Sequence, residues 1–124
     1  MHTVLIVEDD TDFRRLLREI LSNNFPSLQI EEAVSNRQTL KKIKQRSPQL
    51  IFVDTDALNG SSLPLVQKIK NINPAIVVVA LSLYNIPEYE DAALQSRADY
   101  YLAKSSLTFS MLVELVESIF PSPN

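Results

Sequence analysis

Five short aliphatic runs, each followed by a segment with helical periodicity, constrain the fold of this chain more than any other feature. Two of the runs, 50–53 and 75–81, are apolar at every position, and the run 3–7 is apolar except for Thr3, a pattern typical of strands buried on both faces of a parallel sheet. Strands that alternate with helices predict a parallel sheet with helices on both of its faces. The runs are residues 3–7, 28–34, 50–53, 75–81 and 99–103.

The first two helices have clear start signals. Asp10 or Thr11 can cap the first helix, and Ser35 with Gln38 forms a capping box that opens the second, which is expected to extend to about Arg46. The second run, 28–34, contains polar residues and is therefore expected nearer an edge of the sheet. The apolar stripe predicted for the first helix comprises Phe13, Leu16, Leu17, Ile20 and Leu21.

The other three helices follow the third, fourth and fifth strands. Ser62 can cap the third helix, whose first turn tolerates Pro64. The fourth is expected to start at Pro87 and to reach about Ser96, and the fifth spans 107–120. Inward positions expected in the third and fifth helices are Leu65, Val66, Ile69, Leu112, Leu115, Val116 and Ile119.

The predicted fold class is α/β, a flavodoxin-like (βα)5 doubly wound parallel sheet with strand order 2-1-3-4-5. Right-handed crossovers leave few alternatives for five βα units of this length. One domain is expected over residues 1–120, and 121–124 are interpreted as the start of a linker or a disordered tail. In this fold a ligand binds at the carboxyl ends of the strands, where the strand order reverses.

Composition excludes several kinds of site. The chain has no cysteine, a single histidine (His2) and a single glycine (Gly60). Thiolate metal sites, cysteine nucleophiles and glycine-rich phosphate loops are therefore excluded. A net charge of −3 argues against direct nucleic-acid binding. The apolar run 75–81 is too short to cross a membrane, and a cytoplasmic location is expected.

Polar groups follow four of the predicted strands at the point where each strand ends. Acids follow the first and third strands, a hydroxyl follows the fourth and an amine follows the fifth. Clustered carboxylates repel one another, and a hard divalent cation such as Mg²⁺ relieves that repulsion. The lysine can neutralise part of the remaining charge. These groups are Glu8, Asp9, Asp10, Asp54, Asp56, Ser82 and Lys104.

Four motifs, in order along the chain, carry a resemblance to a known family. They are VLIVEDD (4–10), LIFVD (50–54), VVALS (78–82) and DYYLAK (99–104). Through these motifs the chain resembles the receiver domain of two-component response regulators over essentially its whole length. The KSS sequence that starts at Lys104 is similar to receivers of the NarL/LuxR type.

The resemblance implies a phosphoacceptor site that requires a metal. Asp54 matches the aspartate that receives a phosphoryl group from a histidine kinase, a phosphotransfer protein or a small phosphodonor. Glu8, Asp9, Asp54 and the backbone carbonyl of Asp56 match the ligands of Mg²⁺. Ser82 and Lys104 match the groups that bind the phosphoryl group. Such a domain is a signalling domain that assists its own phosphorylation and dephosphorylation, not an enzyme with a separate substrate.

The resemblance also implies a conformational switch. Ser82 is expected to move toward the phosphoryl group, and Tyr101, at the aromatic switch position, to turn inward into the space that Ser82 leaves. The face formed by the fourth helix, the fifth strand and the fifth helix would then contact an output domain or a second copy of the chain.

Four positions depart from the family pattern. Leu58 and Ser105 stand where the family usually has proline, and Arg97 stands where it usually has glycine. Leu83 replaces a small residue next to the site and can restrict access to it. None of these changes removes a chemical group from the site.

Alternative interpretations remain open on the sequence alone. A receiver fold that is never phosphorylated would serve as an interaction module. Asp54 and Asp56 also resemble the D-x-D pair of haloacid-dehalogenase-type phosphatases, although the acids here precede that motif. The basic helix 37–46 is interpreted as a solvated face rather than a nucleic-acid patch. The Asp56 side chain either projects toward the mouth of the site or points into solvent.

Overall fold

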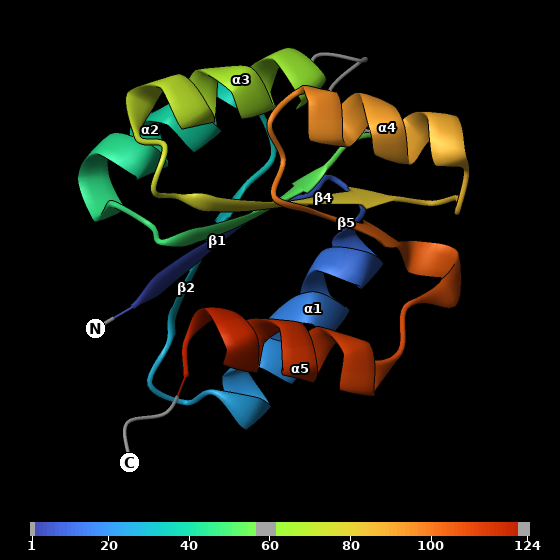
Figure 1. Ribbon diagram of the computed structural model, residues 1–124. Helices are drawn as coiled ribbons and strands as arrows, with labels where there is room; N and C mark the ends of the chain where they lie inside the picture. Colours follow the sequence, from blue (N-terminus) through green and yellow to red (C-terminus); the bar gives the residue numbers. More distant parts are fainter. Residues whose placement is uncertain (1, 57–61, 122–124) are drawn as a thin grey trace.

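Five parallel strands form one sheet that lies between two layers of helices in the computed structural model, which describes residues 2–56 and 62–121 (Figure 1). The strands are β1 (Thr3–Val7), β2 (Gln29–Ala33), β3 (Leu50–Asp54), β4 (Val77–Ser82) and β5 (Tyr100–Ala103). The helices are α1 (Thr11–Asn24), α2 (Asn36–Arg46), α3 (Ser62–Ile72), α4 (Pro87–Gln95) and α5 (Phe109–Ile119), with a short 3₁₀ turn, η2 (Lys104–Ser106), before α5.

The sheet has the order β2-β1-β3-β4-β5, as the sequence predicts. β1 pairs with β2 and β3 on its two sides, and the more polar strand β2 lies at an edge, also as expected. The order reverses at β1, so the carboxyl ends of β1 and β3 lie next to each other. Polar residues that follow these two strands are therefore brought together.

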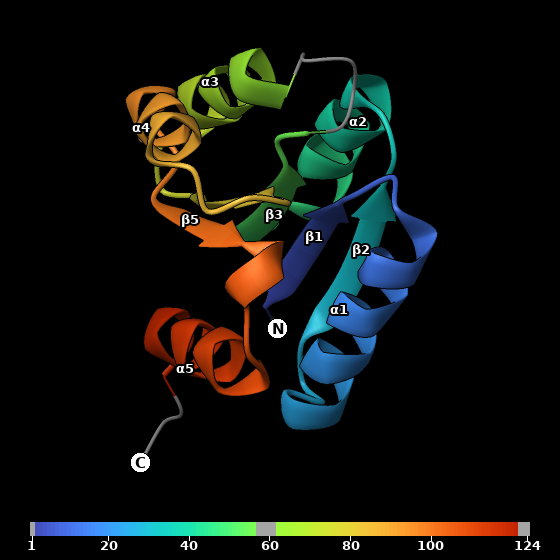
Figure 2. The same cartoon turned by 90° about the vertical axis from the view of Figure 1, so that its right-hand side faces the viewer.

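Successive residues of each central strand face opposite layers of helices. Leu5 and Val7 pack in one cluster with residues of α2, α3 and α4, whereas Val4 and Ile6 pack in a second cluster with residues of α1 and α5. Figure 2 shows α1 and α5 on one side of the sheet and the other three helices opposite them. Every residue of β1 and β3 is buried, which explains their nearly continuous apolar sequence.

Most of the expected helix boundaries are confirmed. The Asp10 side chain caps α1, and Ser35 caps α2. Only half of the predicted capping box forms. The Gln38 backbone N–H donates to Ser35 Oγ at 3.1 Å, but the Gln38 side-chain Oε1 accepts from Val34 N at 2.9 Å rather than from Ser35 N. Two expectations are wrong: Ser62 is the first residue of α3 rather than its cap, and Leu16 is 52% exposed because the buried stripe of α1 is narrower than predicted.

The departures from the family pattern have local consequences. Arg97 adopts a left-handed backbone conformation with φ of 79°, which favours glycine. Among the described residues no peptide bond is cis, so the bond before Ser105 is trans. Leu58 and the tail residues 122–124 lie outside the described residues. Within residues 2–56 and 62–121, none of the helices is both long and apolar enough to span a bilayer.

Candidate phosphoacceptor and metal site

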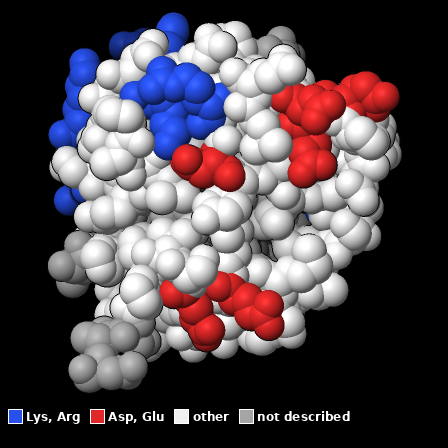
Figure 3. Space-filling model, in the orientation of Figure 1, with Lys and Arg blue, Asp and Glu red and all other residues white. Residues whose placement is uncertain are grey.

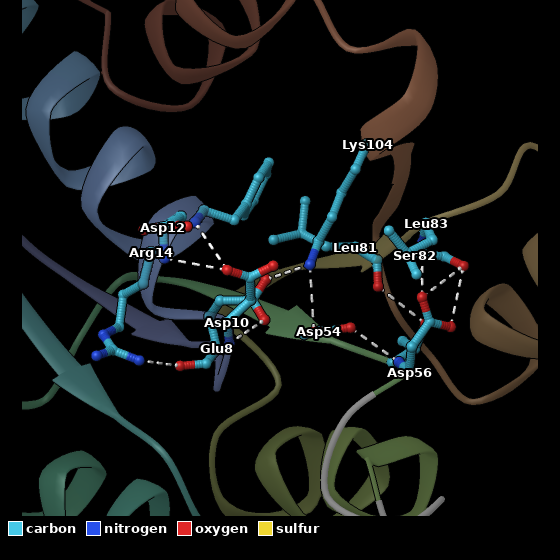
Figure 4. Close-up of polar contacts among 12 residues, drawn as sticks. Glu8, Asp10, Asp12, Arg14, Asp54, Asp56, Leu81, Ser82, Leu83 and Lys104 are labelled. Carbon is cyan, nitrogen blue, oxygen red and sulfur yellow. Dashed lines mark hydrogen bonds and ion pairs between the residues drawn. The ribbon is translucent and has the colours of Figure 1, made fainter.

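The predicted site residues gather at the carboxyl edge of the sheet (Figure 4). β3 ends at Asp54 and β4 at Ser82, while Lys104 directly follows β5. Glu8 follows β1, and its backbone N–H donates to Ala33 O at 3.2 Å, continuing the ladder with β2. The sheet register thus brings groups at the ends of four separate strands, Asp54 among them, to one edge of the sheet.

Glu8 is the most buried acid of the site. Its side chain is fully buried, and Oε1 lies 2.5 Å from Lys104 Nζ in an ion pair. Its Oε2 accepts from the backbone N–H of Asp10 at 3.2 Å. Arg14 Nη1 donates to the Glu8 carbonyl at 2.8 Å and fixes the backbone at this point. A buried carboxyl group, ionised or protonated, needs such partners, since burial without them is costly.

The Lys104 ammonium lies between two carboxylates. In addition to Glu8, it reaches Asp54 Oδ2 at 3.2 Å. The ammonium also lies 4.4 Å from the ring centroid of Phe13, a cation–π distance. Burial alone would lower the pKa of Lys104, but Glu8 and Asp54 outweigh it and raise the pKa above its ordinary value. Lys104 is therefore a permanent cation here.

The two buried carboxylates ionise very differently. Burial, together with the hydrogen bond to Asp54, raises the pKa of Glu8 to about 8, and Lys104 offsets only part of this effect. Burial also acts to raise the pKa of Asp54, but hydrogen bonds from Glu8, the Asp56 amide and Lys104 lower it below its ordinary value. Near neutral pH the pair retains one proton, held mainly by Glu8.

Three carboxylates form a group suited to a divalent cation. Oxygens of Glu8, Asp9 and Asp54 all lie within 4.8 Å of one another. Asp9 is exposed, whereas the other two are buried, so the cluster opens to solvent on the Asp9 side. Carboxylate oxygens are hard ligands of the kind that Mg²⁺ prefers. The set fits the expected cation, and one cation would replace the proton on Glu8.

Asp56 lies beside this group but contacts the end of β4. Its N–H donates to Asp54 Oδ1 at 2.9 Å. Its carboxylate accepts from Ser82 Oγ at 3.1 and 3.3 Å and from Leu83 N at 2.6 Å. The side chain therefore faces the site rather than pointing freely into solvent. Nothing in the sequence indicated that the Leu83 amide would take part.

Tyr101 lies on β5 beside this contact. Its ring is half-buried and packs against the cluster of α2, α3 and α4 residues. Its hydroxyl donates to Tyr84 O at 2.6 Å, and Tyr84 N lies 3.5 Å from Ser82 Oγ. Tyr101 and Ser82 thus both contact the backbone of Tyr84, one through its carbonyl and the other through its N–H.

Sequence reasoning missed two residues that support the site, Arg14 and Phe13. Phe13 was assigned only to the apolar stripe of α1, and Arg14 was given no role, although Arg14 holds the Glu8 carbonyl and Phe13 lies under Lys104. Their position in the first turn of the helix after β1 was the available signal. That turn necessarily lies over the carboxyl edge of the sheet.

Comparison with known proteins agrees with this geometry. Residues 4–117 match the family model of the response regulator receiver domain. The chain belongs to this family. The receiver domain is 32% identical over 104 residues to the KDP operon transcriptional regulatory protein KdpE of Escherichia coli (strain K12), a match that covers 84% of this chain and 45% of KdpE. The match gives no support to the phosphatase interpretation of Asp54 and Asp56.

Other relatives differ in the share of their length that is matched. Chemotaxis protein CheY of Bacillus subtilis (strain 168) is 25% identical over 103 residues, which cover 83% of this chain and 85% of CheY. The signal receiver domain of a DNA-binding response regulator from Colwellia psychrerythraea 34H superposes with a TM-score of 0.89 at 20% identity, covering 98% of this chain and 100% of that one. The receiver domain spans less than half of KdpE, so its output is not defined by that match.

Proposed function

We propose that this receiver domain accepts a phosphoryl group on Asp54 in a reaction that requires Mg²⁺. One observation carries the proposal. The Asp54 carboxylate, which has a lowered pKa, lies 3.2 Å from Lys104 Nζ and within 4.8 Å of the oxygens of Glu8 and Asp9. An ionised carboxylate placed beside a cation site and an ammonium can act as a nucleophile toward phosphorus.

Each neighbouring residue has a role in the proposed reaction. An Asp54 oxygen forms a bond to phosphorus while the bond from phosphorus to the donor's nitrogen or oxygen breaks. Glu8, Asp9, Asp54 and the Asp56 carbonyl would hold Mg²⁺, which supplies charge neutralisation for the phosphoryl oxygens. Lys104 stays protonated and pairs with the same oxygens, and the Ser82 hydroxyl donates a hydrogen bond to them.

The donor would be a sensor histidine kinase, a phosphotransfer protein or a small acyl phosphate. The response surface would be the face of α4, β5 and α5, which borders Tyr101. Figure 3 shows acidic side chains gathered over α4 and α5 on this side of the molecule. These three elements also carry exposed large apolar side chains suited to an output domain or a second copy: Tyr89, Leu94, Tyr100, Phe109 and Met111.

The test is the intact mass after incubation with Mg²⁺ and acetyl phosphate. The protein is expected to gain one phosphoryl group, and Asp54→Asn to gain none. Asp91→Asn, which changes an exposed aspartate on α4, is the matched control and keeps the gain. A phosphoryl group on the Asp54→Asn protein, or no gain on the unmodified protein, would overturn the assignment. The second result would favour a non-phosphorylated interaction module.

A further inference from the structure

The Asp56 carboxylate occupies the two hydrogen-bond donors at the end of β4. Ser82 Oγ donates at 3.1 Å and the Leu83 amide at 2.6 Å (Figure 4). Ser82 is fully buried, so its hydroxyl has few other partners. Each donor has a single hydrogen, and neither can serve a second anion fully while it is bound to Asp56.

The same two donors are what a phosphoryl group on Asp54 would use. Asp54 already accepts from the Asp56 amide at 2.9 Å and from Lys104 at 3.2 Å. A phosphoryl group adds three further acceptor oxygens, which need donors of their own. The next donors along this edge of the sheet are the Ser82 hydroxyl and the Leu83 amide. A carboxylate and a phosphoryl group offer these donors the same kind of partner, an anionic oxygen.

The switch residue lies in the arrangement that this contact would produce. Ser82 faces the acidic side of the site, where its anionic partner is Asp56. Tyr101 packs inward, and its hydroxyl binds Tyr84 O at 2.6 Å, two residues beyond Ser82. This is the placement that the sequence led us to expect for both residues after phosphorylation.

We propose that Asp56 is a positioning residue whose carboxylate stands in for the phosphoryl group. It holds Ser82 and Leu83 in the anion-bound arrangement and thereby keeps Tyr101 inward, until a phosphoryl group on Asp54 displaces it. The displaced side chain has room to move, because a cavity of about 200 Å³ lined by Asp56, Leu63 and Tyr89 adjoins it. This proposal rests on the proposed function and names how the same site is regulated.

The stand-in has a consequence for signalling. Phosphorylation replaces one anion with another at the same donors, so it changes the Ser82–Tyr101 arrangement less than it would in a receiver with a neutral residue at this position. A ligand shifts an equilibrium only by its differential affinity for the two states. The basal population of the inward state should therefore be high, and the further shift on phosphorylation small.

The test records amide and tyrosine-ring nuclear magnetic resonance spectra of the unmodified protein, Asp56→Asn and Asp56→Ala, without Mg²⁺ or a phosphodonor. Both variants should move the Leu83 amide proton upfield, because a hydrogen bond to a carboxylate is lost. Exchange of that proton should be about tenfold faster. The Tyr101 ring signals should shift toward those of a solvent-exposed ring. Asp91→Ala, a control on α4, should leave all of these signals in place.

Beryllofluoride with Mg²⁺ supplies the second arm. In Asp56→Asn it should restore the inward Tyr101 signals, whereas in the unmodified protein it should change them little. Unchanged Leu83 and Tyr101 signals in the Asp56 variants would overturn the proposal. If Asp56→Ala does not give a folded spectrum, Asp56→Asn decides, since it keeps the size of the side chain. Failure of Asp54 to accept a phosphoryl group would overturn the proposed function, but the arm without phosphodonor would still test the stand-in contact.

Discussion

The two sides of Asp54 present opposite electrostatic situations. On the β1–β3 side, Glu8, Asp9 and Asp54 share a single ammonium, that of Lys104, and Glu8 keeps a proton because its pKa is raised to about 8. On the β4–β5 side, one carboxylate, Asp56, has two donors of its own. The first side has too little positive charge, whereas the second side already holds an anion.

Burial explains why the two sides differ. Glu8 and Asp54 lie at the ends of central strands and are 0% and 4% exposed, so water cannot screen their repulsion. Asp56, two residues beyond the end of β3, is exposed. A cation that binds the first side removes repulsion, and an anion that binds the second side must first remove a competitor. The phosphorylation reaction proposed for this domain requires both steps.

The largest effect should come from protonation of Glu8 in the metal-free protein. The pKa of Glu8 is near its ordinary value of 4.5 when unfolded and about 8 when folded, so the folded state binds more protons between these values. Its contribution to stability is present below about pH 4.5 and is lost as pH rises toward 8. The loss is at most about 1.4 kcal/mol per pH unit. The lowered pKa of Asp54 acts only below its ordinary value of 3.8, outside this window.

Thermal unfolding and Mg²⁺ titrations on both sides of this pH range measure the effect. Without metal, the protein should unfold at a lower temperature as pH rises from about 5 to about 8. Mg²⁺ should bind more weakly as pH falls, by up to about tenfold per unit, because it must displace the proton. Glu8→Gln removes the titrating group and should flatten both profiles. A Mg²⁺ affinity that does not vary with pH in the unmodified protein would contradict the unequal charge of the two sides.

A middle-sized effect should follow from removing the charge of Asp56. Asp56→Asn should speed phosphorylation by acetyl phosphate at saturating Mg²⁺, because an anionic donor no longer approaches past a carboxylate. Two unit charges 4 Å apart repel by about 4 kcal/mol at an effective dielectric near 20, before counterions reduce this energy. The loss of inward positioning of Tyr101 opposes the gain but is worth less, since each hydrogen bond involved contributes only about 1 kcal/mol net.

The same variant should bind Mg²⁺ more weakly, by about two- to tenfold, since one negative charge near the cation is lost. Calorimetric titration and phosphorylation time courses of both proteins measure the two effects separately. The Asp91→Asn protein provides the baseline for removing an exposed acid elsewhere. Equal affinities and equal rates would mean that Asp56 influences neither side of the site.

The sequence predicted the order of the strands and the residues that gather at the site. Both follow from where each apolar run ends and which polar residue comes next. Apolar runs define the strands, and the parallel topology brings Glu8, Asp54, Ser82 and Lys104 to one edge whatever the loops do. Their roles in phosphoryl transfer and metal binding stay predictions. The unequal ionisation of Glu8 and Asp54 could not be foreseen, because it depends on burial and on which oxygen each neighbour reaches.

Contacts made by loops and by neighbouring layers were the least predictable. The Leu83 amide binds Asp56 through its backbone, which no residue identity indicates. The basic helix α2 was interpreted as a solvated face, but part of its charge is bound internally. Lys42 and Arg46 lie 2.7 and 3.9 Å from Glu31 on the neighbouring edge strand. Such pairings across elements require the register of β2 against α2, which sequence periodicity does not give.

The smallest effect concerns the turn before β5, at the edge of the sheet opposite Asp56. Arg97 has a φ of 79°, which costs a residue with a Cβ about 1 kcal/mol relative to glycine. Its guanidinium offsets part of this cost by donating to Asn71 Oδ1 at 2.6 Å. Arg97→Ala keeps the Cβ and loses the hydrogen bond, whereas Arg97→Gly loses both.

Chemical denaturation of these two variants therefore isolates the backbone strain at residue 97. Arg97→Gly should be more stable than Arg97→Ala by about 1 kcal/mol, or about 3–5 °C in Tm. The Tyr101 ring signals should be the same in both variants, since the strain is confined to the turn while the position of Tyr101 depends on Ser82 and Asp56. Equal stabilities would show that the turn relaxes without cost. A shift of Tyr101 in the glycine variant would instead place part of the control of the switch in the turn before β5, and would weaken the contrast between the two sides of Asp54.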